Sequence, residues 1–71
     1  MKEEGKGIGV YSGKVIRIVC PEGKIFEGFV SEYLYPDENE NGMESIIIDT
    51  DDGRLIEFYP TDIKEIKVLS Q

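Results

Sequence analysis

The sequence contains no histidine, no tryptophan and one cysteine, and its 8 Lys and Arg are outnumbered by 15 Asp and Glu, giving a formal net charge of −7. The missing residues exclude a Cys/His zinc site, a Ser-His-Asp triad, a Cys-His catalytic pair and an intrachain disulfide framework. The negative charge opposes unaided binding to nucleic-acid phosphates and to anionic lipid, because both need basic patches.

Long apolar runs are also missing. No stretch approaches the ~18 consecutive apolar residues of a membrane span, and the first residues do not form a secretory signal. The single cysteine, Cys20, fits a reducing compartment. We therefore expect a cytoplasmic, non-enzymatic protein with no membrane partner, no cofactor and no metal.

A chain of 71 residues is long enough for one small domain. Glycine stands at positions 5, 7, 9 and 13, and because glycine disfavours helix, we expect residues 1–13 to form a flexible tail. Residues 14–71 alternate between β-branched or aromatic runs and turn sequences, which is typical of an all-β domain. The runs predict strands near 14–20, 24–35, 43–50, 54–59 and 63–69.

Side chains of a strand alternate between the two faces of a sheet, and this divides the apolar residues into two sets. The predicted core set is Ile16, Ile18, Cys20, Phe26, Val30, Ile46, Ile48, Ile56 and Phe58. The predicted outward set is Val15, Val19, Ile25, Phe29, Tyr33, Ile47 and Leu55. An outward face this apolar indicates either bending that covers both faces or contact with another chain. Five short strands with Gly28 inside the second predict a strongly bent antiparallel sheet that closes into a small SH3-like barrel.

The spacing of residues in the first two predicted strands carries a family resemblance. Alternating apolar residues lead to a turn glycine, followed by an aromatic, a bend glycine, an aliphatic and a second aromatic residue: Ile16, Ile18, Cys20, Gly23, Phe26, Gly28, Val30 and Tyr33. The segment Lys14 to Tyr33 thus resembles the first motif of the Sm and Sm-like proteins, and Gly53 to Ile66 resembles a degenerate second motif. The resemblance implies a five-stranded barrel and ring assembly, in which the fourth strand of one subunit pairs with the fifth of the next.

The RNA-contacting residues of that family are not retained. Its aspartate after the second aromatic is Leu34 here, and its asparagine before the third strand's apolar triplet falls at Ser45. Its Arg-Gly pair at the end of the fourth strand is Tyr59-Pro60. The resemblance therefore extends to the fold and to assembly, and not to the RNA contacts.

Two short motifs match functional patterns only in part. Residues 37–42 form the first half of a calcium-binding loop, but position 12, which needs a bidentate glutamate, is Ile48. The glycines of 7–13 lack the spacing of a phosphate-binding loop. We predict a solvated turn for the first, and for the aspartates of 49–52 an exposed hairpin tip. Cys20 is predicted to be a packed core residue.

The outward apolar set favours an interaction module that forms a homo-oligomer or contacts another protein. The predicted contact residues are Phe29, Tyr33, Ile47, Leu55 and Tyr59. The alternative is an Sm-like RNA-binding protein that lacks the usual RNA-contact residues. For that role the basic residues near the turn glycines would have to form one patch, and they are Lys14, Arg17, Lys24 and Arg54.

Overall fold

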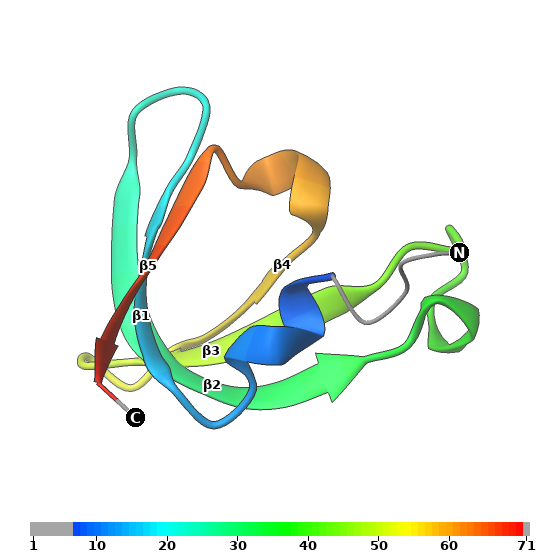
Figure 1. Cartoon of the computed structure of the whole chain (residues 1–71), viewed down its shortest axis with the longest axis horizontal. Helices are drawn as coiled ribbons and strands as arrows, with labels where there is room; N and C mark the ends of the chain where they lie inside the picture. Colours follow the sequence, from blue (N-terminus) through cyan, green and yellow to red (C-terminus); the bar gives the residue numbers. More distant parts are fainter. Residues whose placement is uncertain (1–6, 71) are drawn as a thin grey trace.

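A computed structural model describes residues 7–70 as one five-stranded antiparallel sheet in the order β4-β3-β2-β1-β5 (Figure 1). The strands are β1 (Val15–Val19), β2 (Ile25–Leu34), β3 (Ser45–Thr50), β4 (Leu55–Phe58) and β5 (Glu65–Ser70). Three short 3-10 helices accompany them: η1 (Ile8–Tyr11), η2 (Pro36–Glu38) and η3 (Pro60–Asp62). The prediction of an all-β chain with five antiparallel strands is confirmed. No helix in this described range has the length and apolarity needed to cross a membrane.

Strand β2 bends the sheet because its two halves pair with different neighbours. Its first half pairs with β1, from Val19 opposite Ile25 onward, and its second half pairs with β3 as far as Leu34. Gly28 lies where the two ladders overlap, and a Cβ atom built there would stand 2.5 Å from the carbonyl oxygen of Asp49. Only glycine lets β2 and β3 approach this closely, and the curvature of β2 is evident in Figure 1.

The prediction that the sheet closes into a barrel is wrong for the described residues. β4 and β5 stand at opposite ends of the strand order and share no ladder. β4 has four residues and runs into η3, after which the Lys64 amide donates a hydrogen bond to the Val19 carbonyl oxygen (2.7 Å). The strand that follows, β5, therefore pairs with β1 and not with β4. The sheet stays open between its two edge strands.

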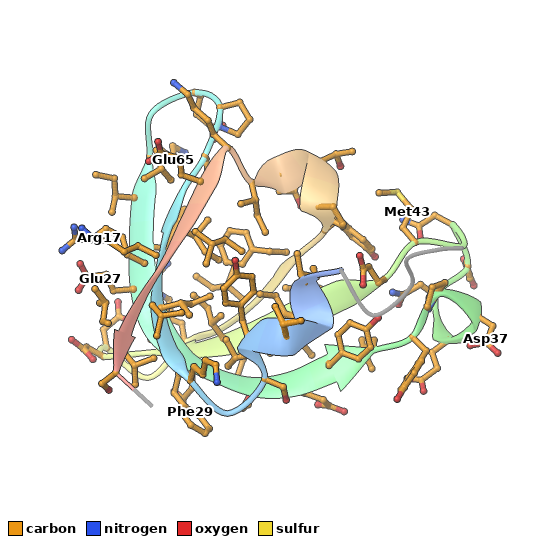
Figure 2. All side chains as sticks on the ribbon, viewed as in Figure 1. Arg17, Glu27, Phe29, Asp37, Met43 and Glu65 are labelled. Atoms are coloured by element: carbon orange, nitrogen blue, oxygen red, sulfur yellow. The ribbon has the colours of Figure 1, made fainter. Side chains whose placement is uncertain are left out.

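The core fills the concave side of the bent sheet (Figure 2). All buried hydrophobic residues of the core belong to the predicted core set: Ile16, Ile18, Cys20, Val30, Ile46, Ile48 and Phe58. The two other members of that set, Phe26 and Ile56, are partly buried and pack against this cluster. The rings of Phe26 and Phe58 lie 5.3 Å apart, centre to centre.

A β-bulge in β2 overturns the prediction that Tyr33 faces outward. Val30 lies opposite Ile48, but Glu32, two residues later, lies opposite Ile47, so Ser31 is an extra residue in the ladder. An extra residue reverses the facing of everything that follows it in the strand. Tyr33 therefore lies opposite the buried Ile46 and packs against the core.

Part of the predicted tail, residues 1–13, lies against the sheet. Ile8 and Tyr11 of η1 pack on the core cluster. The segment after η1 joins β2 through backbone hydrogen bonds, from the Gly13 amide to the Val30 carbonyl (3.0 Å) and from the Val30 amide to the Lys14 carbonyl (2.9 Å). Residues 1–6, which belong to the same predicted tail, lie outside the described residues.

Candidate functional site

Two of the predicted contact residues share one row on the outward face. Val15 of β1 lies opposite Phe29, Phe29 lies opposite Asp49, and Asp49 lies opposite Leu55. The side chain of Phe29 is 45% exposed and that of Leu55 is 69% exposed. This row places three apolar residues around one carboxylate, which is a small outward patch rather than a continuous apolar face.

The other three predicted contact residues lie outside this row, and only Ile47 shares its face of the sheet. Ile47 faces outward between Glu32 and Glu57, its two cross-strand neighbours. Tyr59 is half-buried before η3, where its backbone amide donates to Oδ2 of Asp62 (3.0 Å). Tyr33 lies on the concave side. The structure therefore does not gather the five residues into one surface.

The four basic residues of the RNA alternative are also not gathered. Nε of Arg17 lies 2.7 Å from a Glu27 carboxylate oxygen, and Nε of Arg54 lies 3.0 Å from one of Asp52. Lys14 precedes β1, whereas Lys24 lies beyond the other end of that strand, where its carbonyl accepts the Cys20 amide (2.8 Å). Carboxylates thus face both arginines, and the two lysines lie at opposite ends of a strand.

The edges of the sheet expose apolar side chains that the sequence did not single out. Val68 and Leu69 of β5 are 38% and 41% exposed. Val68 lies opposite the buried Ile16, so it faces the concave side beside the opening between β5 and β4. The ladder shifts register between Val15 and Ile16, which is where β5 carries Leu69 as an extra residue. Together with the exposed Leu55 of β4, these residues give both edge strands apolar groups next to backbone that has no partner strand within residues 7–70.

A concave pocket of about 470 Å³ lies between the amino-terminal segment and the end of β2. Its lining residues are Gly7, Gly9, Val10, Tyr33, Tyr35 and Glu44. The Tyr33 hydroxyl donates to Oε1 of Glu44 (2.7 Å), and the rings of Tyr33 and Tyr35 lie 5.0 Å apart at 73°. Burial of Tyr33 and then its hydrogen bond to Glu44 raise the pKa of the phenol to about 12. The sequence did not predict this pocket, because strict alternation of side chains along β2 placed Tyr33 on the outward face.

The acidic loop between β2 and β3 is held by its asparagines. Nδ2 of Asn39 donates to the Met43 carbonyl (2.7 Å) and to Oγ of the buried Ser45 (3.0 Å). Oδ1 of Asn41 accepts the Met43 amide (3.0 Å). Ser45 in turn donates to a Glu57 carboxylate oxygen (2.7 Å). Asn41 of the partial calcium motif therefore forms an Asx-type turn, and the Asn39 side chain links the loop to Met43 and Ser45.

Two further kinds of candidate site would be a reactive Cys20 thiol and a cluster of metal-binding side chains. Burial raises the pKa of the Cys20 thiol above its ordinary value, which disfavours the reactive thiolate. Within residues 7–70, no group of three or more Cys, Asp or Glu side chains is placed to hold a metal ion.

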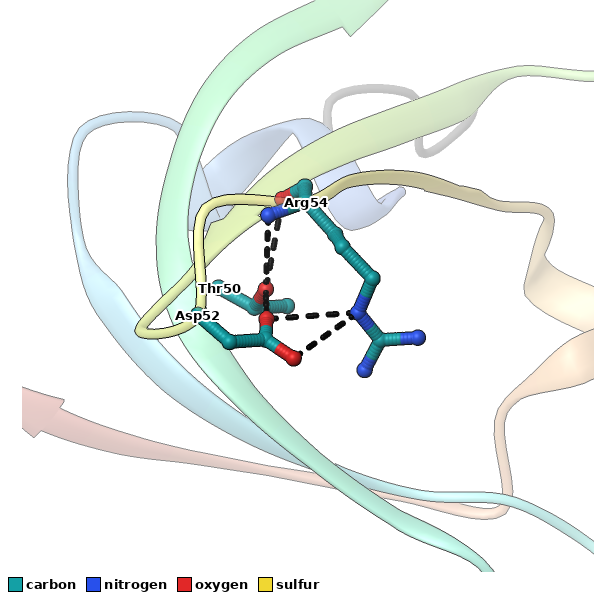
Figure 3. A network of polar contacts seen from close by, with 3 residues as sticks. All are labelled: Thr50, Asp52 and Arg54. Carbon is teal, nitrogen blue, oxygen red and sulfur yellow. Dashed lines mark hydrogen bonds and ion pairs between the residues drawn. The ribbon is translucent and has the colours of Figure 1, made fainter.

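The β3–β4 hairpin carries a polar network of three residues (Figure 3). The Thr50 hydroxyl donates to Oδ1 of Asp52 and accepts the Arg54 backbone amide (3.2 Å). Nε of Arg54 donates to both Asp52 oxygens, at 3.2 and 3.0 Å. The Thr50 hydrogen bond and then the Arg54 contacts lower the pKa of Asp52 below its ordinary 3.8.

This network predicts a specific loss of stability in acid. Because the folded-state pKa of Asp52 is lowered, its contribution is present above pH 4 and is lost as the pH falls through the lowered value. Asp52→Asn should flatten the dependence of unfolding free energy on pH in that window, and Thr50→Val should raise the Asp52 pKa and cost about 1 kcal/mol at neutral pH. Urea unfolding between pH 2 and 7 measures both effects. The control is Asp51→Asn, since Asp51 makes no side-chain hydrogen bond within residues 7–70; an equal flattening there would contradict the assignment.

No protein-family model matches this chain, and comparisons with curated proteins and with solved structures gave no match. The resemblance to the Sm-like proteins therefore stays a prediction from the sequence.

Proposed function

We propose that this chain is a non-enzymatic interaction module that self-associates by pairing the β4 edge of one copy with the β5 edge of the next. The observation that carries the proposal is the open sheet, whose two end strands have no partner strand within residues 7–70. Unpaired strand edges are templates for addition of another strand. The exposed Leu55, Val68 and Leu69 on these edges supply apolar surface for such a contact.

One antiparallel register matches the two edges. Ile56 and Phe58 lie opposite the buried Ile48 and Ile46, so they face the concave side of β4. Ile66 and Val68 face the same side of β5, opposite Ile18 and Ile16. A register with Phe58 opposite Ile66 places Ile56 opposite Val68, and joins the apolar sides of the two copies into one core.

The outward side chains favour the same register. It sets Glu57 opposite Lys67 and Leu55 opposite Leu69, an opposite-charge pair and an apolar pair. A shift by two residues in one direction sets Glu57 opposite Glu65, where like charges repel. A shift in the other direction sets the apolar Ile56 opposite Ser70. The charges and the apolar pattern thus select one alignment.

Pairing of this kind is head-to-tail, because it joins two different surfaces. A head-to-tail contact closes into a ring when the rotation between copies allows it, and otherwise extends as a filament. The strand of the neighbouring copy would cover the open side of each sheet, so that a barrel-like core forms between copies. The predicted Sm-like relationship supports this geometry, since its assembly uses the same two strands.

The experiment is a charge swap across the proposed contact, read by size-exclusion chromatography with light scattering over a range of concentrations. Wild type should be a multimer, and Lys67→Glu should raise the dissociation midpoint at least roughly fivefold, because an attractive cross-strand pair becomes repulsive. The double variant Glu57→Lys with Lys67→Glu should restore association. Lys67→Glu should leave the isolated chain folded, because its cross-strand neighbour on β1, Arg17, carries the opposite charge to the new glutamate.

The matched control is Lys24→Glu, which changes the net charge equally but lies in the β1–β2 turn. Thermal unfolding of the double variant checks the monomer, because Glu57 also accepts the Ser45 hydrogen bond. A wild-type monomer at every concentration would refute self-association. Equal weakening by Lys24→Glu would refute the register.

A further inference from the structure

The pocket beside η1 combines aromatic walls with a carboxylate. Tyr33 and Tyr35 line it as adjacent rings inclined at 73°, and Glu44 lies where the Tyr33 hydroxyl reaches it. Gly9 makes the close approach of η1 possible, because a Cβ atom there would stand 3.0 Å from Cε1 of the Tyr33 ring. Tyr35 is 60% exposed, so one of the two rings is open to a ligand.

The charged groups that the described residues place at the pocket are carboxylates. Oε1 of Glu44 accepts the Tyr33 hydroxyl; Oε2, which like Oε1 lies against Gly7, makes no hydrogen bond with any residue in the range 7–70. Glu38 of the following acidic loop adds to the negative potential at the Tyr33 hydroxyl. No Lys or Arg is among the described residues that line the pocket. The Tyr33 phenol is protonated at physiological pH, as any tyrosine with an ordinary pKa near 10 is, so it donates its hydrogen bond to Glu44 there.

We propose that this pocket binds an arginine side chain presented by a basic segment of a partner protein. Aromatic faces and a carboxylate are the groups that attract an organic cation. A guanidinium group stacks flat on an aromatic ring while its edge donates hydrogen bonds, and it is more weakly hydrated than an ammonium group. A pocket with two aromatic rings and a single lining carboxylate therefore fits a guanidinium group better than the ammonium group of lysine. The ammonium group is compact and strongly hydrated, so it loses more on leaving water.

The net charge of −7 supports a basic partner, since it raises the rate at which positively charged segments arrive. The site is independent of the proposed self-association, because no residue of β4 or β5 lines the pocket. Failure of one proposal therefore leaves the other standing.

The test uses the full chain and three fluorescein-labelled peptides that differ at one kind of residue. The first is Gly-Ser-Arg-Gly-Ser-Arg-Gly-Ser, the second has lysine in place of arginine, and the third has citrulline, the neutral isostere of arginine. Fluorescence anisotropy at 50 mM salt should show binding of the arginine peptide, with at least roughly tenfold weaker binding of the citrulline peptide. The lysine peptide should fall between them.

Variants locate the binding. Tyr35→Ala and Glu44→Gln should each weaken binding of the arginine peptide by roughly 3- to 30-fold, the range expected for a partly desolvated cation–π contact. Glu40→Gln is the matched control, because it removes the same charge from the nearby loop without lining the pocket. Circular dichroism of each variant checks that it is folded, and the exposure of Tyr35 predicts that its substitution is tolerated.

Several outcomes overturn the proposal. Equal binding of the arginine and citrulline peptides removes the role of the cation, and equal binding of the lysine peptide removes the preference for guanidinium. Equal weakening by Glu40→Gln and Glu44→Gln means that the overall charge, and not the pocket, attracts the peptide. Absence of binding at millimolar peptide refutes the site. Light scattering on the same samples shows whether self-association is intact, which separates this result from the fate of the edge contact.

Discussion

Gly28→Ala is expected to lower the free energy of unfolding by at least about 3 kcal/mol, because the added methyl group would overlap the backbone of β3. The added Cβ atom would stand 2.5 Å from the Asp49 carbonyl oxygen and 3.2 Å from Cα of Thr50. Neither atom can move without separating β2 from β3. A chain of 71 residues has a total stability of roughly 4–10 kcal/mol, so this methyl group should leave a large unfolded fraction. Urea unfolding followed by circular dichroism measures the loss.

Gly42→Ala is the matched control for Gly28→Ala. Gly42 has a positive φ of 74°, and nothing lies within 4 Å of an added Cβ atom. Its substitution should cost about 1 kcal/mol, because it strains only the local backbone. Comparable losses at the two positions would show that β2 and β3 are not in close contact at Gly28.

Ile46→Lys and Ile47→Lys should have opposite outcomes, although the two residues are adjacent in β3. Ile46 is fully buried, so its lysine variant loses core packing and buries a charge, and we expect more than about 4 kcal/mol of destabilisation and an unfolded chain. Ile47 faces outward between Glu32 and Glu57. A lysine there gains attractive cross-strand pairs that offset its lost apolar contact, so stability should change by less than about 1 kcal/mol.

Heteronuclear NMR spectra and thermal unfolding of both lysine variants test this contrast. A dispersed spectrum for Ile47→Lys with a collapsed one for Ile46→Lys is the expected result. Collapse of both would mean that the outward face of β3 is covered in the isolated chain. Survival of both would contradict the register in which Ile46 lies opposite Tyr33 and Phe58.

Local pattern was enough to locate the strands and most of the core. Runs such as 15–19 and 45–50 are rich in β-branched residues and are bounded by turn sequences, so both their type and their approximate ends follow from short-range chemistry. Gly23 and Gly53 adopt positive φ values of 99° and 85° in the tight turns that the sequence indicates. Alternation then assigns each side chain to a face, as it does correctly for Ile16, Ile18 and Ile48.

The same alternation fails at one residue in β2, and the failure concerns the candidate site. The residue types around Ser31 do not indicate a bulge. The extra residue arises because β2 pairs with two different strands, β1 and β3. Once Ser31 is extra, Tyr33 lies inward, next to Gly9 of η1. The pocket is thus a product of the bulge and of the docking of η1.

The sequence by itself determined an acidic all-β chain without a histidine-dependent site, the approximate strands and the inward set of apolar residues, because these depend on composition and on period-two spacing. Only the tertiary structure decided that the sheet stays open, which edges are unpaired and which polar groups converge on Tyr33 and Glu44. These features depend on contacts between residues far apart in the chain, such as Lys64 with Val19 and Tyr33 with Glu44. Such contacts are selected by how whole strands fit together, and no local pattern encodes that fit.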